Sequence, residues 1–345
     1  MNPSVTTELL AALGAASARA CLLCVLVAIF VTLLGRRLAP QWRCALWFLV
    51  FLRLAWPFHV SSPISLFGFF ELFREHSSTG GVLGTTSGYL HPLTAGTATN
   101  TVLFVWRLVA GLFAIRLVAG SAWNAWRLRA ARPLTSWEVW WLFQQSKEAC
   151  GLRGPVAIYE SPKVSSPCLA GFFSPRIVLP KNMLKDLSIE EVRLVFLHEL
   201  AHLKRGDLWL GWIFEGLRSL HWFNPAVWYA CRRFYEDREE ACDAVALSAT
   251  PGSNRTYGRL LLRFMSGTPN GVALLNGAAF TDGAATPPEL LIRRIRAIAS
   301  FQPGGRSWCI GLTLIVFLGC IGFTEPPVAA ETCTCPAHAC TGMGQ

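Results

Sequence analysis

Two histidines and one glutamate in the segment 197–203 have the types and spacing to bind a metal ion and activate water. His198 and His202 are four residues apart, so one turn of α-helix places both imidazoles on the same face. That spacing lets both bind one zinc ion, and Glu199 beside them can act as general base on a zinc-bound water. The alternative is chance, because H-E-x-x-H is a short pattern that needs supporting context.

The sequence also marks the start of the helix that would carry this pattern. Ser188 is followed three residues later by Glu191, which forms a capping box, and an apolar run comes next. We therefore predict a helix from about 188 to 205. Asp207 comes directly after a glycine, and we expect it to cap the following helix, which is apolar and rich in tryptophan.

A third metal ligand is available downstream. A zinc hydrolase holds its metal with three protein ligands and leaves one position open for water. Glu239 and Asp243 are four residues apart and share a helix face, so Glu239 can complete the site and Asp243 can orient a ligand histidine. Glu236 and Glu240 have the same spacing, so spacing alone does not choose between the pairs. A solvated acidic face is the alternative.

Four sequence elements, in this order, resemble the membrane-embedded BlaR/MecR-type antirepressor zinc metallopeptidase family. The resemblance extends from about residue 8 to about residue 323, and it implies Glu239, not Glu240, as the third ligand. It also implies a mainly α fold, with a four-helix transmembrane region and an inserted α+β zincin-like (gluzincin) protease domain. The four elements are G-F-x-x-P-x-I-x-L-P at 171–180, H-E-x-x-H-x-x-x-x-D at 198–207, W-F-N-P at 222–225 and E-x-x-x-D, containing C-D, at 239–243.

The composition indicates a membrane protein. The chain has 345 residues, of which 52% are hydrophobic and only 15% are charged, with a mean hydropathy of +0.39. These values argue against an ordinary soluble protein. The net charge of +10 fits basic loops on the cytoplasmic side, and no signature of a nucleic-acid-binding fold accompanies it.

Hydropathy and basic residues together predict a multi-pass protein of the inner (plasma) membrane. Basic residues follow the first and third apolar runs and are nearly absent from the loop 59–100, which places that loop outside. The predicted parts are a membrane region at 1–120 with spans at 9–34, 44–58 and 101–120, a cytoplasmic zinc metallopeptidase domain at 121–305, a fourth transmembrane helix at 306–323, and a short outside tail at 324–345.

Within the polar domain we predict an amphipathic helix at 137–150, a strand at 156–160 and a strand pair at 172–179. The arm from Arg176 to Leu179, with Ile177 as a substrate contact, is assigned to an edge strand that pairs with an extended substrate. A core strand is the alternative. Further helices are predicted from Pro225, capped by Asn224, to about 248 and from 287 to about 299.

The predicted reaction is peptide-bond hydrolysis, in which Glu199 takes a proton from water and passes it to the leaving amine. His221, Tyr235 and Arg238 are candidate oxyanion or substrate contacts. The resemblance implies signal transduction by cleavage of a winged-helix repressor, directly or indirectly, and self-cleavage, which we place in the loop 267–286. The expected partners are this protein substrate, the lipid bilayer and a second copy in a homodimer, with no direct contact to nucleic acid.

The chain departs from the best-known family members after its last apolar run. Those members carry a penicillin-binding sensor domain there, whereas only about 22 residues follow here, so beta-lactam sensing by this chain itself is not expected. Those residues include a cluster that could bind metal or sense redox state, or could belong to a disordered terminus: Cys333, Cys335, His338 and Cys340. Two other functions are a prenyl-protein protease-like enzyme and a non-catalytic signalling scaffold, and the intact Glu199 argues against the scaffold.

Overall fold

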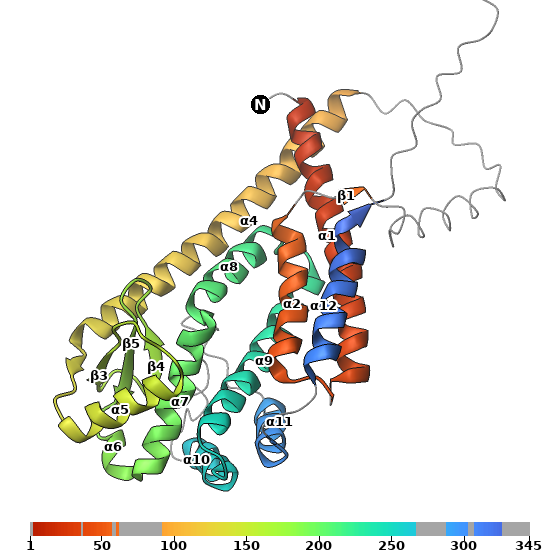
Figure 1. Cartoon of the computed structure of the whole chain (residues 1–345). Helices are drawn as coiled ribbons and strands as arrows, with labels where there is room; N and C mark the ends of the chain where they lie inside the picture. Colours follow the sequence, from red (N-terminus) through yellow and green to blue (C-terminus); the bar gives the residue numbers. More distant parts are fainter. Residues whose placement is uncertain are drawn as a thin grey trace, which may run out of the picture. The chain divides into compact units, whose positions relative to one another are not determined.

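The computed structural model describes residues 3–35, 37–56, 60–61, 92–266, 288–302 and 307–325, and these are mainly helical (Figure 1). The chain divides into two compact units, one of residues 1–57 and 88–318 and one of residues 58–87 and 319–345. In the second unit, β1 (Val60–Ser61) pairs in parallel with β6 (Thr324–Glu325). The predicted self-cleavage loop 267–286 and the cysteine cluster of the tail lie outside the described residues.

Four helices contain the predicted apolar runs: α1 (Pro3–Leu34), α2 (Pro40–Ala55), α4 (Pro92–Arg127) and α12 (Ser307–Phe323). Within the described residues, two segments are long and apolar enough to cross a membrane, 8–34 and 99–130, while α12 is a shorter apolar helix. The apolar surface of α4 is largely exposed, as expected of a helix that faces lipid. Two crossings are therefore supported by length and composition, and four remain a prediction.

The helix α2 packs on α9 (Pro225–Ala249) and α8 (Asp207–Leu220). Trp47 of α2 is fully buried and donates its indole N–H to Asp237 of α9 at 2.9 Å. Phe51 of α2 stacks on Phe214 of α8, with ring centroids 4.0 Å apart. A predicted membrane helix and the helices of the polar domain therefore share one apolar core.

A four-stranded sheet packs on the zinc-motif helix through its strand β4 (Cys168–Ala170). Its order is β2 (Arg132–Pro133), β3 (Ala157–Ser161), β5 (Arg176–Pro180) and β4. Strands β3 and β5 are parallel, and β4 is antiparallel to β5. The second arm of the strand pair predicted at 172–179 is confirmed as β5, but the first arm is wrong. Phe172 lies in the loop 171–175, and the strand that pairs with β5 is β4, which ends at Ala170 because Gly171 turns the chain with a φ of 90°.

The assignment of Arg176 to Leu179 as a substrate-pairing edge strand is wrong. This segment is β5, which lies between β3 and β4, and Ile177 is fully buried with no exposed surface. Its three consecutive apolar side chains are all buried, as in a strand that is covered on both faces. The edge strand beside the zinc-motif helix α7 (Ile189–Arg205) is β4.

The helices that position the site begin where their sequence signals predict. In α7, Ser188 Oγ accepts from the Glu191 amide at 3.3 Å, and the Glu191 carboxylate accepts from the Ser188 amide at 2.8 Å, which confirms the capping box. At α9, Asn224 Oδ1 accepts from the Ala226 amide at 2.9 Å, and Pro225 occupies the first helical position. The remaining helices of this part are α5 (Trp137–Ala149), α6 (Met183–Asp186), α10 (Asn254–Ser266) and α11 (Pro288–Ala299).

Candidate metal centre

His198, His202 and Glu239 come together between α7 and α9. The Nε2 atom of His198 lies 3.6 Å from one carboxylate oxygen of Glu239, and the Nε2 atom of His202 lies 3.9 Å from the other. Ligand atoms of a tetrahedral zinc site with bonds of about 2.0–2.1 Å lie roughly 3.3 Å apart. All three residues are buried, and one set of their ligand atoms lies within 4.8 Å of one another. A small closure would therefore let these residues hold one zinc ion.

The second ring nitrogen of His198 is held by two groups. Its Nδ1 atom lies 3.1 Å from Asp243 Oδ1 and 2.9 Å from the hydroxyl of Tyr257 on α10. Tyr257 also donates its hydroxyl proton to Asp243 Oδ1 at 2.6 Å. Nδ1 of His198 is therefore the nitrogen engaged by these groups, and Nε2 is the nitrogen that faces Glu239 and could bind a metal ion. The predicted pairing of Asp243 with a ligand histidine is therefore present.

His202 has a different carboxylate partner. Its Nδ1 atom lies 2.8 Å from Asp207 Oδ2 and 3.3 Å from the thiol of Cys242. The prediction that Asp207 caps α8 is wrong, because the cap position belongs to Gly206 and no side-chain capping bond is formed. Asp207 is within reach because Gly206, with a φ of 70°, ends α7 and turns the chain back toward His202.

Arg294 of α11 connects the two acidic residues of α9. It donates to both oxygens of Asp243, at 2.7 and 2.6 Å, and to Glu239 at 3.3 Å. Arg238 donates to the other oxygen of Glu239 at 2.8 Å. All four side chains are buried. The two arginines therefore fix the carboxylate that faces the histidines, and they compensate its charge in a region of low dielectric.

Glu199 makes no comparable bond to an arginine among the described residues. It is 4% exposed, and its Oε2 atom has no hydrogen-bond partner among the described residues. Burial raises the pKa of its carboxyl, an effect opposed by the nearby His202 and His198. Glu199 and His198 line a small cavity that is otherwise mostly apolar. A buried carboxylate oxygen without a hydrogen-bond partner among the described residues, beside two histidines of the same helix, fits a site built for a metal ion and a water molecule.

The charges around the centre favour an ionised carboxylate ligand. Burial acts to raise the pKa of Asp243, but Arg294 and the hydrogen bond to His198 lower it to about 2. Burial also acts to raise the pKa of Glu239, but the hydrogen bond to His198 and the charge of Arg238 outweigh it, so this pKa falls well below its ordinary value. Burial acts to lower the pKa of His198, but its bonds to Asp243 and Glu239 raise it to about 9. A bound metal ion would take the place of that extra proton.

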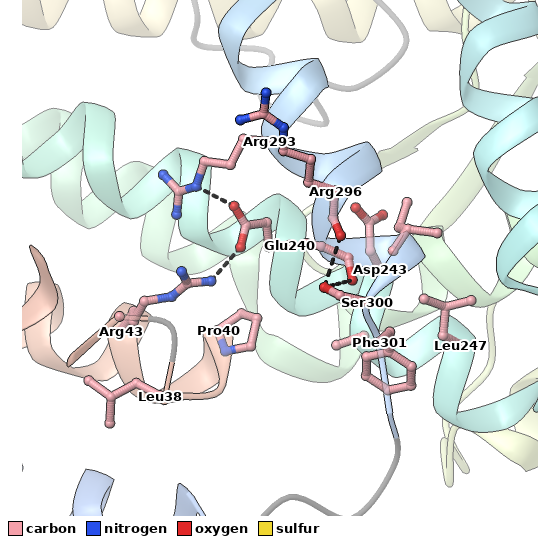
Figure 2. A pocket seen from close by; sticks show the side chains of 14 residues that line it. Leu38, Pro40, Arg43, Glu240, Asp243, Leu247, Arg293, Arg296, Ser300 and Phe301 are labelled. Atoms are coloured by element: carbon pink, nitrogen blue, oxygen red, sulfur yellow. Dashed lines mark hydrogen bonds and ion pairs between the residues drawn. The ribbon is translucent and has the colours of Figure 1, made fainter. Parts of the chain in front are cut away.

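The second acidic pair of α9, Glu236 and Glu240, contacts arginines and not the two histidines. Glu240 lies between Arg43 of α2 and Arg293 of α11, and it pairs with both (Figure 2). The three side chains line a cavity of about 550 Å³ on the side of α9 that faces the α1–α2 turn. Glu236 pairs with Arg293 at 3.1 Å. The structure therefore places Glu239, and not Glu240, at the histidines, a choice that the sequence spacing alone left open.

The three candidate oxyanion groups are placed differently from one another. Arg238 reaches the centre, through its bond to Glu239. The Tyr235 hydroxyl donates to Glu215 at 3.1 Å, and the ring of His221 is bonded to Ser17 of α1 at 2.9 Å. The structure therefore gives neither Tyr235 nor His221 a contact with the metal-binding residues.

Sequence reasoning did not find Tyr257 or Arg294, and it assigned Asp207 a different role. Tyr257 belongs to α10, which was not predicted although its apolar residues recur at helical spacing. Arg294 lies on the predicted helix α11, but nothing local distinguishes it from the neighbouring Arg293 and Arg296. Asp207 stands at a fixed place in the H-E-x-x-H-x-x-x-x-D pattern, so the pattern itself was the signal for its contact with His202.

A histidine pair on one helix, a glutamate on the next and flanking apolar helices form the arrangement expected of a membrane metallopeptidase. Comparison with known proteins agrees with this class. Residues 11–296 match the family described as BlaR1 peptidase M56, and the chain belongs to that family. The resemblance to BlaR/MecR-type peptidases is thereby confirmed.

Individual relatives share part of the chain. It is 32% identical over 162 residues to the regulatory protein BlaR1 of Bacillus licheniformis, an alignment that covers 47% of this chain and 26% of that protein. It is 30% identical over 88 residues to the methicillin resistance mecR1 protein of Staphylococcus aureus, covering 26% of this chain and 15% of that protein. The chain thus spans about a quarter or less of these relatives' lengths.

Proposed function

We propose that this protein is a membrane-embedded zinc metalloendopeptidase that transduces a signal by regulated cleavage of a cytoplasmic transcriptional repressor and of itself. The observation that carries the proposal is the buried centre of His198, His202 and Glu239, beside which one carboxylate oxygen of Glu199 has no hydrogen-bond partner within the part of the chain that the structure describes. Membership of the BlaR1 peptidase family supports the same conclusion.

Each residue of the centre has a separate task. His198 and His202 would hold zinc through Nε2, and Glu239 would hold it through its carboxylate, which the two arginines keep ionised. When bound, zinc supplies a Lewis acid that lowers the pKa of water and polarises a carbonyl group. Glu199 accepts the proton of the attacking water and donates it to the leaving amine, and its raised pKa suits both steps.

The edge of the sheet supports an extended peptide as the substrate. Strand β4 packs on α7, and its outer edge is unpaired among the described residues. An extended segment could add to β4 as a further strand, where backbone hydrogen bonds would hold it across the centre. This mode takes an unfolded or locally unfolded segment, such as a linker, and not a folded surface.

The cellular setting is argued from charge and from the relatives. The basic residues that follow the apolar runs support a centre on the cytoplasmic side of the inner membrane. One relative is named a regulatory protein and another a methicillin resistance protein, which supports regulation as the role. A winged-helix repressor is the proposed substrate, with four membrane crossings and a homodimer as the proposed arrangement.

A non-catalytic scaffold would need the metal ligands but no base beside them. Burying a carboxylate oxygen without a partner destabilises a protein by about 1–3 kcal/mol or more, so a purely structural site would gain by losing it. The Glu199 oxygen, which no described residue pairs with, therefore favours the enzyme.

The test compares wild type with Glu199→Gln in lipid nanodiscs. Zinc content is measured by elemental analysis, and cleavage of the protein itself and of a library of extended peptides is measured by mass spectrometry. We expect about one zinc in both proteins, cleavage by wild type only, and loss of that cleavage on chelation with recovery on zinc addition. Zinc in both proteins with cleavage by neither would contradict the enzyme, and absence of zinc from both would contradict the centre.

A further inference from the structure

Four aromatic side chains, two exposed and two half-buried, form a cluster next to the edge strand. Phe172 and Phe173 lie in the loop 171–175 between β4 and β5, and Trp209 and Trp212 lie on the first turns of α8. Ring centroids of Phe172 and Trp209 are 3.5 Å apart, and those of Phe173 and Trp209 are 6.0 Å apart. Phe173 is 87% exposed and Trp209 is 49% exposed. We call these four residues the aromatic loop cluster.

The loop that presents the cluster has a fixed shape. Gly171 has a φ of 90°, and a Cβ atom at this position would lie 2.2 Å from the carbonyl oxygen of Ser174. Only glycine therefore allows the loop to close here, and Pro175 restricts the backbone on the other side. The exposure of Phe173 is thus a property of a defined turn, where an apolar ring meets the solvent at its tip.

The cluster is continuous with a surface that is suited to lipid. Helix α8, which carries the two tryptophans, lies alongside α4 (Figure 1), and Trp106 of α4 donates to the carbonyl of Leu220 at 2.9 Å. On α4, Leu112 is 58% exposed and Ile115 is 65% exposed. On α8, Ile213 is 50% exposed. The exposed apolar side chains therefore extend from a helix long enough to cross a membrane to the helix that bears the cluster.

The end of α4 carries the residue types of a membrane–water boundary. Trp123 and Trp126 are more than half exposed there. Lys163, from the turn after β3, lies 4.8 Å over the ring of Trp126, and Arg127 donates to the carbonyl of Lys163 at 2.6 Å. Tryptophans with lysine and arginine at the end of an apolar helix favour the headgroup region, where the cations meet anionic lipid.

We propose that the aromatic loop cluster inserts into the cytoplasmic leaflet of the bilayer, beside the end of α4. The inference rests on the membrane residence in the proposed function and specifies which surface of the polar domain contacts lipid. Phenylalanine at a loop tip supplies the apolar area, and tryptophan ring N–H groups remain at the level of the headgroups.

This placement limits what the enzyme can reach. Strand β4 ends at Ala170, directly before Gly171 of the loop, so insertion of the loop holds the substrate-pairing edge at the bilayer surface. Asp207, which contacts His202, is two residues from Trp209 on the same helix. The substrates that fit are extended segments close to the membrane, and those include segments of this chain that adjoin its own membrane helices.

The test uses the full-length, zinc-loaded protein in nanodiscs of phosphatidylcholine and phosphatidylglycerol. The environment-sensitive fluorophore NBD is attached to a cysteine at one of three positions, in a background without other reactive thiols. Phe173→Cys reports on the cluster, Leu112→Cys reports on α4, and Ile189→Cys is a matched exposed apolar position (75% exposed) at the opposite end of α7. Zinc content of each labelled protein verifies that it is folded.

We expect blue-shifted emission at 173 and 112 and quenching by nitroxide-labelled lipid that is at least about twofold stronger than at 189. Quenching at 112 with a water-like spectrum at 173 would overturn the inference and leave the proposed function intact. A blue shift at 173 without lipid quenching would also overturn it, because protein would then cover the cluster. Lack of quenching at both 112 and 173 would contradict membrane residence itself.

Discussion

Arg294 donates hydrogen bonds to both carboxylate oxygens of Asp243, at 2.7 and 2.6 Å, although 51 residues separate them. Neither side chain has appreciable exposure. Through Asp243 the arginine fixes the ring of His198, and through a bond of 3.3 Å it also contacts Glu239. One residue of α11 thus holds two of the three proposed metal ligands, so α11 belongs to the metal centre.

Arg294→Gln should therefore weaken zinc binding without removing any ligand. Loss of a group that orients a ligand typically lowers metal affinity by about 10–100-fold, and breaking a buried ion pair destabilises the fold by roughly 3–5 kcal/mol. Competition with a fluorescent zinc chelator measures the first effect, and thermal unfolding in nanodiscs measures the second. Arg259→Gln, on the exposed face of α10, is the control and should change neither zinc affinity nor stability. Unchanged zinc affinity in Arg294→Gln would contradict the positioning role of Arg294.

A substitution of Asp207 separates its two candidate roles. Asparagine caps helices about as well as aspartate, so Asp207→Asn would leave zinc affinity unchanged if the residue were a cap of α8. In the structure its carboxylate accepts from His202 at 2.8 Å, so we expect Asp207→Asn to lower zinc affinity by about 10–100-fold.

The measurement for Asp207 is again chelator competition, with the helix content from circular dichroism as a check on folding. Asp186→Asn, in the short helix α6, serves as the matched control, since it replaces another aspartate with asparagine outside the metal centre. If both variants bind zinc as wild type does, Asp207 has no role in holding His202.

Glu199→Gln should raise the stability of the metal-free protein while abolishing cleavage. The carboxyl is buried, and one of its oxygens has no partner among the described residues, so replacement by a neutral amide removes a buried charge whose desolvation the nearby histidines offset only in part. We expect an increase of about 1–3 kcal/mol in the free energy of unfolding of the zinc-free form. Denaturant unfolding after chelation measures it, and a decrease in stability would show that Glu199 is paired in the native protein.

Sequence reasoning predicted the helices that carry the candidate site where the signals are local. The capping box at Ser188 and the cap at Asn224 each depend on residues within one turn, so the starts of α7 and α9 could be predicted. The four-residue spacings on α7 and α9 likewise fixed which side chains share a face. Each of these features is encoded within a few consecutive residues, where backbone geometry leaves few options.

Sequence reasoning failed where a local rule fits two structures equally well. An aspartate after a glycine suits a helix cap, but tertiary packing gives Asp207 a partner on the preceding helix instead. Ile177 lies in a run that suits either an edge or a central strand, and only the pairing of β5 on both sides decided between them. Tyr257 and Arg294 reach the centre from segments far along the chain, and contacts of that kind leave no local pattern.

Substitution of Trp47 tests whether packing of α2 stabilises α9, the helix that carries Glu239. Its indole N–H donates to Asp237 at 2.9 Å, and Asp237 is two residues from Glu239 on α9. Trp47→Phe keeps an aromatic ring but removes the donor, which leaves the fully buried Asp237 with only its arginine partners, Arg43 and Arg293. We expect a loss of about 1–3 kcal/mol in stability.

The zinc affinity of Trp47→Phe should fall less than that of Arg294→Gln, because the change acts on Glu239 only through the backbone of α9. Trp56→Phe, at the exposed cap residue that follows α2, controls for removal of an indole near the same helix. Thermal unfolding and chelator competition on the three variants rank them by stability and by zinc affinity. If Trp47→Phe unfolds like wild type, the bond to Asp237 contributes nothing to the packing of α2 on α9.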